Sequence, residues 1–231
     1  MTVLGIDTST MTGGAALVNS QGLVGEYVLN LRTTHSERLL PAIQRILADA
    51  ELTLDQLDGI AVVTGPGSFT GLRIGVATAK GFAYALGKPI VGVTTLAALA
   101  WQHQTFKGFI YPLIDAKRQD VYSQVFAGVD AVTEPCNSSI DRIIQWCSQQ
   151  KNPALFVGDG AVAHKTALAA LSNSVFPSSE GLVLRASAVA GLGMHLLSQG
   201  NHIDPFDLIP FYMRKSSAEY QRDRAEDKNE G

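Results

Sequence analysis

Cysteine is scarce in this sequence, and its scarcity bears on where the chain works. Only Cys136 and Cys147 occur among the 231 residues. Residues 1–7 lack the basic start, the long apolar stretch and the small-residue cleavage site of a secretory signal. Two cysteines without such a signal are typical of free thiols in a reducing cytosol. We therefore expect a cytoplasmic protein that does not depend on a disulfide.

Long apolar runs and an excess of positive charge are also missing. The apolar stretch at residues 74–86 contains Lys80 and Gly81, and no segment offers the roughly 20 uninterrupted apolar residues that a membrane helix needs. The 18 basic and 21 acidic residues give a formal net charge of -3, which supplies no basic surface for a phosphate backbone. We expect no membrane association, and contact with tRNA or other nucleic acid only through a partner.

The usual catalytic motifs are absent as well. None of the five histidines lies three or four residues from another, so the sequence has no helical metal pair. It also contains neither the Gly-x-Ser-x-Gly elbow of serine hydrolases nor a Walker phosphate loop. The sequence therefore predicts no metal site and no catalytic residue.

What is present is the pattern of an α/β protein. Hydrophobic residues make up 46% of the chain and charged residues 17%, which favours compact folding. Runs with strand and helix periodicity follow one another in a β-β-β-α-β-α-β-α unit and then in a shorter copy of it. Strands are expected at residues 3–8, 14–18, 23–29, 60–64, 90–93, 110–114, 121–126 and 154–157. Helices are expected at 37–50, from the glycine loop to about 86, and at 95–104, 141–149, 161–171 and 187–198.

A glycine loop at residues 65–71 lies between a predicted strand and a predicted helix. Glycines let backbone N–H groups turn inward, and the start of a helix adds positive partial charge, so the loop could hold a phosphate. A tight turn that needs glycine for its backbone shape explains the loop equally well. Asp7 could position a metal-bound water beside such a phosphate, but capping of the first turn is the favoured explanation.

The predicted helix at residues 37–50 is amphipathic. Its apolar residues recur at helical spacing, and Thr34 with Glu37 has the form of a capping box. Pro41 should kink this helix unless its regular turns begin near Leu40. Taken alone, the apolar face indicates core packing rather than a partner surface.

Six stretches of this sequence together resemble the TsaB (YeaZ) family over nearly the whole chain. The glycine loop and the helix after it are the most specific of them. The stretches are Gly-Ile-Asp-Thr-Ser at 5–9, His-Ser-Glu-Arg-Leu-Leu-Pro at 35–41, Gly-Pro-Gly-Ser-Phe-Thr-Gly-Leu-Arg-Ile-Gly at 65–75, Ile-Asp-Ala-Lys-Arg at 114–118 with Val-Tyr at 121–122, Val-Gly-Asp-Gly at 157–160, and Pro-Phe-Tyr-Met-Arg at 210–214.

The resemblance implies a fold and a division of the chain. The fold is the actin-like ATPase (ASKHA, Hsp70-like) α/β fold, with two lobes of ribonuclease-H-like topology and a reduced second lobe. The first lobe is expected at residues 1–105, a smaller second lobe at 106–214, and a flexible charged tail at 215–231.

The resemblance also implies a function in tRNA modification. In this family the chain is a non-catalytic scaffold for the sister enzyme TsaD, which transfers a threonylcarbamoyl group to the adenosine beside the anticodon of tRNAs that read ANN codons. The small ATPase TsaE joins them, and a TsaB homodimer forms when TsaD is absent. TsaD carries a His-x-x-x-His metal pair near the end of its first lobe, whereas this chain has Leu99 four residues before His103 and Lys107 four residues after it.

Two groups of residues follow from the resemblance. The helix after the hairpin is implied to contact the partner through His35, Ser36, Arg38, Leu39, Leu40, Ile43 and Leu47. A phosphate would be held by Asp7, Thr8, Ser9, Gly65, Gly67, Ser68, Thr70, Gly71 and Arg73. Ser9, where actin-like ATPases favour glycine, and Asp159, where they favour a second glycine, depart from the pattern. We therefore expect no cofactor in the isolated chain and leave open ATP or ADP with Mg shared at the partner interface.

Two other function classes compete with the scaffold. An independent ATP-dependent phosphotransferase of the actin-like superfold would use Asp7 and the glycine loop. A peptidase is suggested by an old grouping of this superfamily with metallopeptidases, and the missing histidine pair argues against it.

Overall fold

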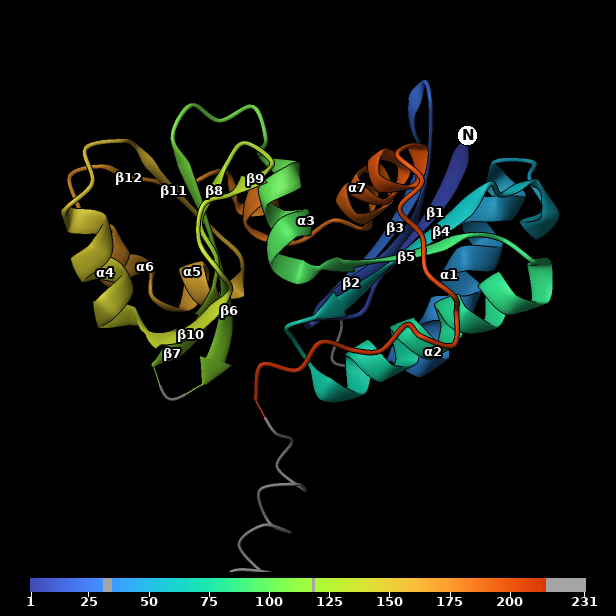
Figure 1. The fold of residues 1–231 in the computed structure, drawn as a ribbon, viewed down its shortest axis with the longest axis horizontal. Coiled ribbons are helices and arrows are strands. Elements are labelled where there is room, and N and C mark those ends of the chain that lie inside the picture. Colours follow the sequence, from blue (N-terminus) through green and yellow to red (C-terminus); the bar gives the residue numbers. More distant parts are fainter. Residues whose placement is uncertain (31–34, 118, 215–231) are drawn as a thin grey trace, which may run out of the picture.

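Two lobes stand side by side in the structure, and each is built around one sheet (Figure 1). The structure is a computed structural model that describes residues 1–30, 35–117 and 119–214. The tail expected at 215–231 lies outside the described residues. In the described part of the chain, no helix has the length and apolar character needed to span a membrane.

The first lobe contains a five-stranded sheet in the order β3-β2-β1-β4-β5. The first three strands form an antiparallel meander, and the last two run parallel to β1. The expected hairpin turn after Asn19 is confirmed, and the Asn19 side chain accepts a hydrogen bond from the Gln21 amide at 2.8 Å. The strands are β1 (Thr2–Asp7), β2 (Thr12–Asn19), β3 (Gly22–Asn30), β4 (Gly59–Gly65) and β5 (Ile90–Thr94).

The second lobe repeats this topology. Its main path has the order β10-β7-β6-β11-β12, with the same alternation of antiparallel and parallel pairs, and β8 and β9 form a side ribbon on β6. This duplication confirms the shorter second copy and the actin-like α/β fold. The strands are β6 (Phe109–Lys117), β7 (Asp120–Ser123), β8 (Phe126–Ala127), β9 (Asp130–Ala131), β10 (Cys136–Ser139), β11 (Ala154–Val157) and β12 (Ser174–Val175).

Helices cover the sheets in layers. Alternate residues of β1 face opposite sides, so Leu4 and Ile6 pack with α1 and α2, whereas Val3 packs in a core shared by both lobes. The helices are α1 (His35–Asp49), α2 (Phe69–Leu86), α3 (Thr95–Gln102), α4 (Ile140–Ser148), α5 (Asp159–Ala163), α6 (Lys165–Leu168) and α7 (Ala186–Ser198), with 3₁₀ turns at Leu54–Gln56 and Ser179–Leu182.

The last helix returns to the first lobe, which corrects the expected boundary. A Cβ at Gly5 of β1 would lie 2.5 Å from the Ala186 carbonyl oxygen of α7, so the helix packs directly on the strand backbone. Beyond α7, the Ile203 amide bonds to the Ile90 carbonyl of β5 at 3.1 Å. Residues 186–212 therefore pack on the first lobe, whereas the sequence predicts residues 106–214 in the second lobe.

Pro41 lies inside α1, which begins at His35, so the alternative of a helix that starts near Leu40 is excluded. Two local expectations differ from the structure. The helix expected at 161–171 is two short helices, α5 and α6, that meet at His164. The strand expected at 121–126 is β7 with the first residue of β8, and the short strands β9 and β10 follow where the sequence pattern predicts none. These short, polar or exposed strands carry too few apolar residues to show a period.

Candidate functional site

The two segments expected to bind phosphate meet in the first lobe, at the end of β1. Asp7, Thr8 and Ser9 are each 1% exposed. The Thr8 hydroxyl donates to the Gly71 carbonyl of α2 at 2.7 Å, and the Ser9 carbonyl accepts from the Ser68 amide at 2.7 Å. The structure thus brings both segments together by direct hydrogen bonds between them.

The glycines of this loop permit that close approach. A Cβ at Gly67 or Gly71 would meet the carbonyl oxygen of Ser9 or Thr8, far closer than the 3.4 Å at which ordinary contact begins. Gly65 has a φ of 129°, which side chains other than glycine rarely adopt. Backbone packing and turn shape therefore account for these glycines, and phosphate binding by the loop stays a prediction.

The start of α2 is occupied by the chain itself. The Ser68 hydroxyl accepts from the Gly71 amide at 3.2 Å, as an N-cap residue does, while Thr70 is exposed. The Phe69 ring stacks on Tyr212 with centroids 4.6 Å apart, and Arg73 Nε donates to the Tyr212 hydroxyl at 3.0 Å. Arg73, which is predicted to face a phosphate, is therefore already hydrogen-bonded to Tyr212.

Residues 201–214 form a strap across this end of the lobe. The Phe211 amide donates to the Thr64 carbonyl at 2.7 Å, and Lys80 Nζ donates to the Leu208 carbonyl at 3.0 Å. Arg214 continues to the second lobe, where it donates to the Ala116 carbonyl at 2.9 Å. The strap thus ties α2, β4 and the second lobe together, and Figure 1 shows it running along α2.

Asp7 is bonded within its own turn. Its Oδ1 accepts from the Ser9 amide at 2.8 Å and from the Ser9 hydroxyl at 2.7 Å. This is the local capping arrangement that the sequence favoured. A metal-bound water beside Asp7 is not needed to explain the carboxylate's position and stays a prediction.

Charged residues also lie together at the end of β6 in the other lobe. The Asp115 carboxylate accepts from the Lys117 amide at 2.8 Å and from Lys117 Nζ at 2.6 Å, and the Asp115 amide donates to Asp159 at 3.0 Å. Desolvation would raise the pKa of Asp115, but the Lys117 hydrogen bonds outweigh it and the pKa is lowered. The end of β6 thus carries an ion pair between two of its own residues.

His103 has a structural role. Its Nε2 lies 2.8 Å from the Gly181 carbonyl oxygen, and Leu99, one turn earlier, is fully buried in the core. The side-chain nitrogen of the neighbouring Gln102 donates to the Val183 carbonyl at 3.1 Å. Its side-chain oxygen accepts from the backbone amide of Arg185 at 3.1 Å. Within the described residues, no three His, Cys, Asp or Glu side chains are grouped so that they could hold a metal ion. The end of α3 instead fixes the segment that leads into α7.

The partner surface expected on α1 needs a correction. Leu39, Ile43 and Leu47 are 4%, 1% and 7% exposed and pack in the core of their own lobe. Leu40 is 46% exposed, and Arg38 is exposed as well. The side chains of His35 and Ser36 lie outside the described residues. Contact of α1 with a partner stays a prediction, and Leu40 is the apolar residue among those proposed that is free to make it.

Sequence reasoning missed the part played by Glu26. Its side chain is 4% exposed, and its carboxylate accepts from the Ser187 amide at 2.9 Å, the Ser187 hydroxyl at 3.0 Å and Arg185 Nε at 2.9 Å. An acidic side chain at the start of a helix satisfies free amides and the helix dipole. A single glutamate within an otherwise apolar strand was the signal in the sequence.

Comparison with known proteins gives one consistent result. The family model TsaD, described as tRNA N6-adenosine threonylcarbamoyltransferase, matches residues 23–205. The tRNA threonylcarbamoyladenosine biosynthesis protein TsaB of Bacillus subtilis is 32% identical over 225 residues, covering 95% of this chain and 96% of that protein. The protein of the same name from Haemophilus influenzae is 30% identical over 232 residues, covering 93% and 94%.

A solved structure agrees on the fold. It is described as an uncharacterized protein with similarity to peptidase YEAZ from Pseudomonas aeruginosa, and it matches with a TM-score of 0.79 and 24% identity over 92% of this chain and 99% of that one. Because the two TsaB relatives are 30–32% identical to this chain and are matched over nearly their whole length, the chain belongs to the TsaB (YeaZ) family.

Proposed function

We propose that the chain serves the formation of threonylcarbamoyladenosine in tRNA as a non-catalytic subunit. In this proposal it docks on a threonylcarbamoyltransferase of the TsaD kind and organises the transfer site, TsaE joins the pair, and tRNA is held by the assembly. The names of the two relatives and the description of the family model support the pathway. The local geometry supports the division of labour.

The environment of His103 is the observation that carries this proposal. The family resemblance implies that the sister enzyme carries two histidines, four residues apart, at the corresponding place in its fold. In this chain, the position four residues earlier holds Leu99, buried in the core, and His103 contacts a backbone carbonyl. These residues serve packing and linkage of the lobes, which fits a fold retained for assembly rather than for metal chemistry.

The hydrogen bonds of the glycine loop in the first lobe support the proposal that the isolated chain binds no nucleotide. A phosphotransferase needs its loop amides free to receive phosphate oxygens. Here the Ser68 amide is bonded to Ser9, the Gly71 amide to the Ser68 hydroxyl, and Arg73 to Tyr212. We propose that ATP or ADP with Mg²⁺ is held jointly with the partner.

The outer side of α1 is the docking surface that we propose. Leu40 is 46% exposed on this helix, and the edge strand β3 beside it presents Leu23 and Tyr27 at 57% and 38% exposure. A Cβ at Gly25 of β3 would lie 3.4 Å from Ile46 of α1, so helix and strand form one surface. Aromatic and aliphatic side chains with a polar rim are typical of the centre of an interface.

Co-purification with the TsaD partner from the same organism tests the proposal. Leu40→Arg should weaken the heterodimer by about 30-fold, because a charge would be buried at the centre of the contact. Val132→Arg is the matched control, since Val132 is 47% exposed in the second lobe. Light scattering and thermal unfolding of both variants separate lost association from lost folding, and equal retention of the heterodimer by both would contradict the docking surface.

Activity is then measured as threonylcarbamoyl transfer to unmodified tRNA, with and without this chain. We expect transfer to require the chain, while the chain alone neither turns over ATP nor binds Mg-ATP in calorimetry. Micromolar binding and ATP turnover by the isolated chain would favour the phosphotransferase instead.

A further inference from the structure

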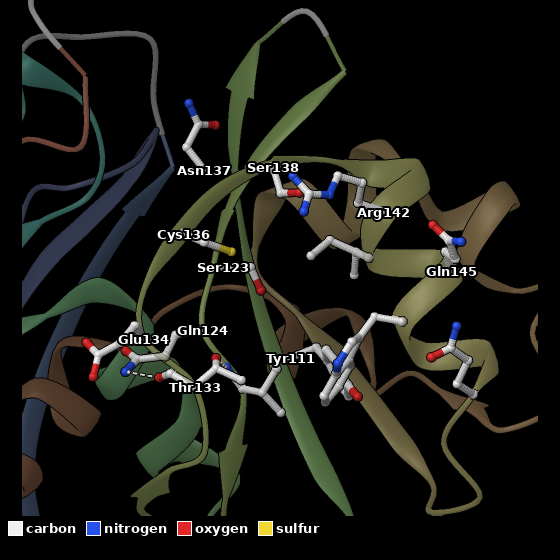
Figure 2. Close-up of a pocket in the computed structure, with 14 residues that line it drawn as sticks. Tyr111, Ser123, Gln124, Thr133, Glu134, Cys136, Asn137, Ser138, Arg142 and Gln145 are labelled. Carbon is white, nitrogen blue, oxygen red and sulfur yellow. Dashed lines mark hydrogen bonds between the residues drawn. The ribbon is translucent and has the colours of Figure 1, made fainter.

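A cavity of about 430 Å³ opens in the second lobe, between its sheet and α4 (Figure 2). Its size falls within the usual range for sites that bind small molecules. It lies away from the first-lobe loop and from α1, so neither the family nor the proposed docking surface accounts for it. The lining residues used below are Tyr111, Ser123, Val125, Arg142, Ile143 and Trp146.

The walls of this cavity are apolar and aromatic. Tyr111 and Val125 come from the sheet side and are buried, whereas Ile143 and Trp146 come from α4 and are half-buried. The Tyr111 and Trp146 rings meet edge to face with centroids 5.7 Å apart. Rigid aromatic walls of this kind suit a flat ring, which they contact at little entropic cost.

Ser123 supplies a polar group that the chain does not use. It lies on β7, is 1% exposed, and its hydroxyl has no hydrogen-bond partner among the described residues. Val121, two residues earlier on β7, packs in the core beneath α4, so Ser123 faces the same way, and it lines the cavity. A buried hydroxyl without a partner destabilises a fold, and a ligand group that bonds to it would offset that cost.

Arg142 supplies a positive charge at the edge of the cavity. It is exposed and forms no ion pair with any residue that the structure describes. Figure 2 shows Arg142 beside Ser138 on one side and Glu134 on the other side of the cavity. A carboxylate that enters beside Arg142 would gain a charge-assisted hydrogen bond.

We propose that this cavity binds a small aromatic acid. Its ring lies against Trp146 and Val125, a polar group at its far end bonds to the Ser123 hydroxyl, and its carboxylate pairs with Arg142. The inference adds a ligand site in the second lobe to the proposed scaffold and does not depend on it.

Trp146 provides a local probe for the test. The chain has two tryptophans, so ¹⁵N-labelled full-length protein gives two indole N–H signals, and Trp101→Phe assigns them. Titration with 4-hydroxyphenylacetate should shift the Trp146 signal saturably, with a Kd on the order of 1 mM for a ligand of this size. Phenylacetate lacks the far hydroxyl and 4-hydroxyphenylethanol lacks the carboxylate, so each removes one proposed contact.

Two variants match these two analogues. Arg142→Gln should weaken 4-hydroxyphenylacetate about fivefold and leave 4-hydroxyphenylethanol unchanged, as for an exposed ion pair. Ser123→Ala should weaken 4-hydroxyphenylacetate but not phenylacetate. It should also raise the melting temperature, because it removes a buried hydroxyl that has no partner and adds no atoms.

The outcomes decide the proposal in either direction. Saturable shifts at Trp146 that follow both pairings support it. The proposal is wrong if the Trp146 signal does not move, if the Trp101 signal moves equally, or if both variants bind every probe as the unmodified chain does.

Discussion

Gly71→Ala separates packing from ligand binding as the reason for the glycine loop. A Cβ at this position would collide with the Thr8 carbonyl oxygen, a backbone atom that cannot move aside cheaply. Overpacking of this kind costs about 1–3 kcal/mol, and the displaced turn would also lose the Thr8–Gly71 hydrogen bond, worth about 1 kcal/mol. Because alanine favours the helix by about 1 kcal/mol over glycine, we expect a net loss of about 2 kcal/mol.

Gly81→Ala is the matched control on the same helix. Nothing lies within 4 Å of a Cβ at Gly81, so this change should stabilise the protein by about 1 kcal/mol through helix propensity alone. At roughly 2–4 °C per kcal/mol for a chain of this length, Gly71→Ala should lower the melting temperature by about 4–8 °C, while Gly81→Ala raises it by about 2–4 °C.

Urea unfolding followed by circular dichroism and by tryptophan fluorescence measures both variants. Coincident transitions in the two signals show whether one free energy describes the unfolding of both lobes. If Gly71→Ala proves as stable as Gly81→Ala, the packing explanation of the loop fails.

Two further predictions concern groups outside the loop. Glu26→Ala should destabilise the protein by about 2 kcal/mol, because it leaves the Ser187 amide and Arg185 without their partner, whereas Glu26→Gln should lose less; equal unfolding midpoints for all three proteins would contradict this. Burial raises the pKa of the Cys147 thiol to about 11, and it also raises the pKa of Cys136 against the lowering effect of nearby Arg142. Cys136 is exposed and Cys147 is buried, so at pH 8 a thiol reagent should modify Cys136 first and Cys147 only on unfolding. Loss of the fast phase in Cys136→Ser checks the assignment, and two equal fast phases would refute it.

The sequence predicted much of the fold because its signals are local. The β-rich runs at residues 3–8 and 14–18, the turn chemistry at 19–22, and the glycines between strand and helix at 65–71 each depend on near neighbours. The family resemblance then ordered these pieces into two lobes. The placement of α7 was not predictable in this way, because periodicity identifies an apolar face but not the sheet that covers it.

The candidate site, like the fold, was predictable only where local sequence signals place its residues. The meeting of Asp7, Thr8 and Ser9 with the glycine loop follows from the ends of the neighbouring parallel strands β1 and β4. The bond between Arg73 and Tyr212 joins residues 139 positions apart, and no local pattern indicates it. The same holds for α1, where spacing showed that Leu39 and Leu40 belong to an amphipathic helix but not which of them faces the sheet.

The return of the chain to its first lobe has a consequence for its synthesis. A core of the second lobe is made of residues between 109 and 182, so it can close as soon as that segment has left the ribosome. The first sheet is completed only by α7 and the strap, which are translated after the second-lobe core. Domains usually fold in the order in which they are translated. Here the half that is translated first is completed last, and a ribosome that stalls before residue 186 holds a first lobe with one face of its sheet uncovered.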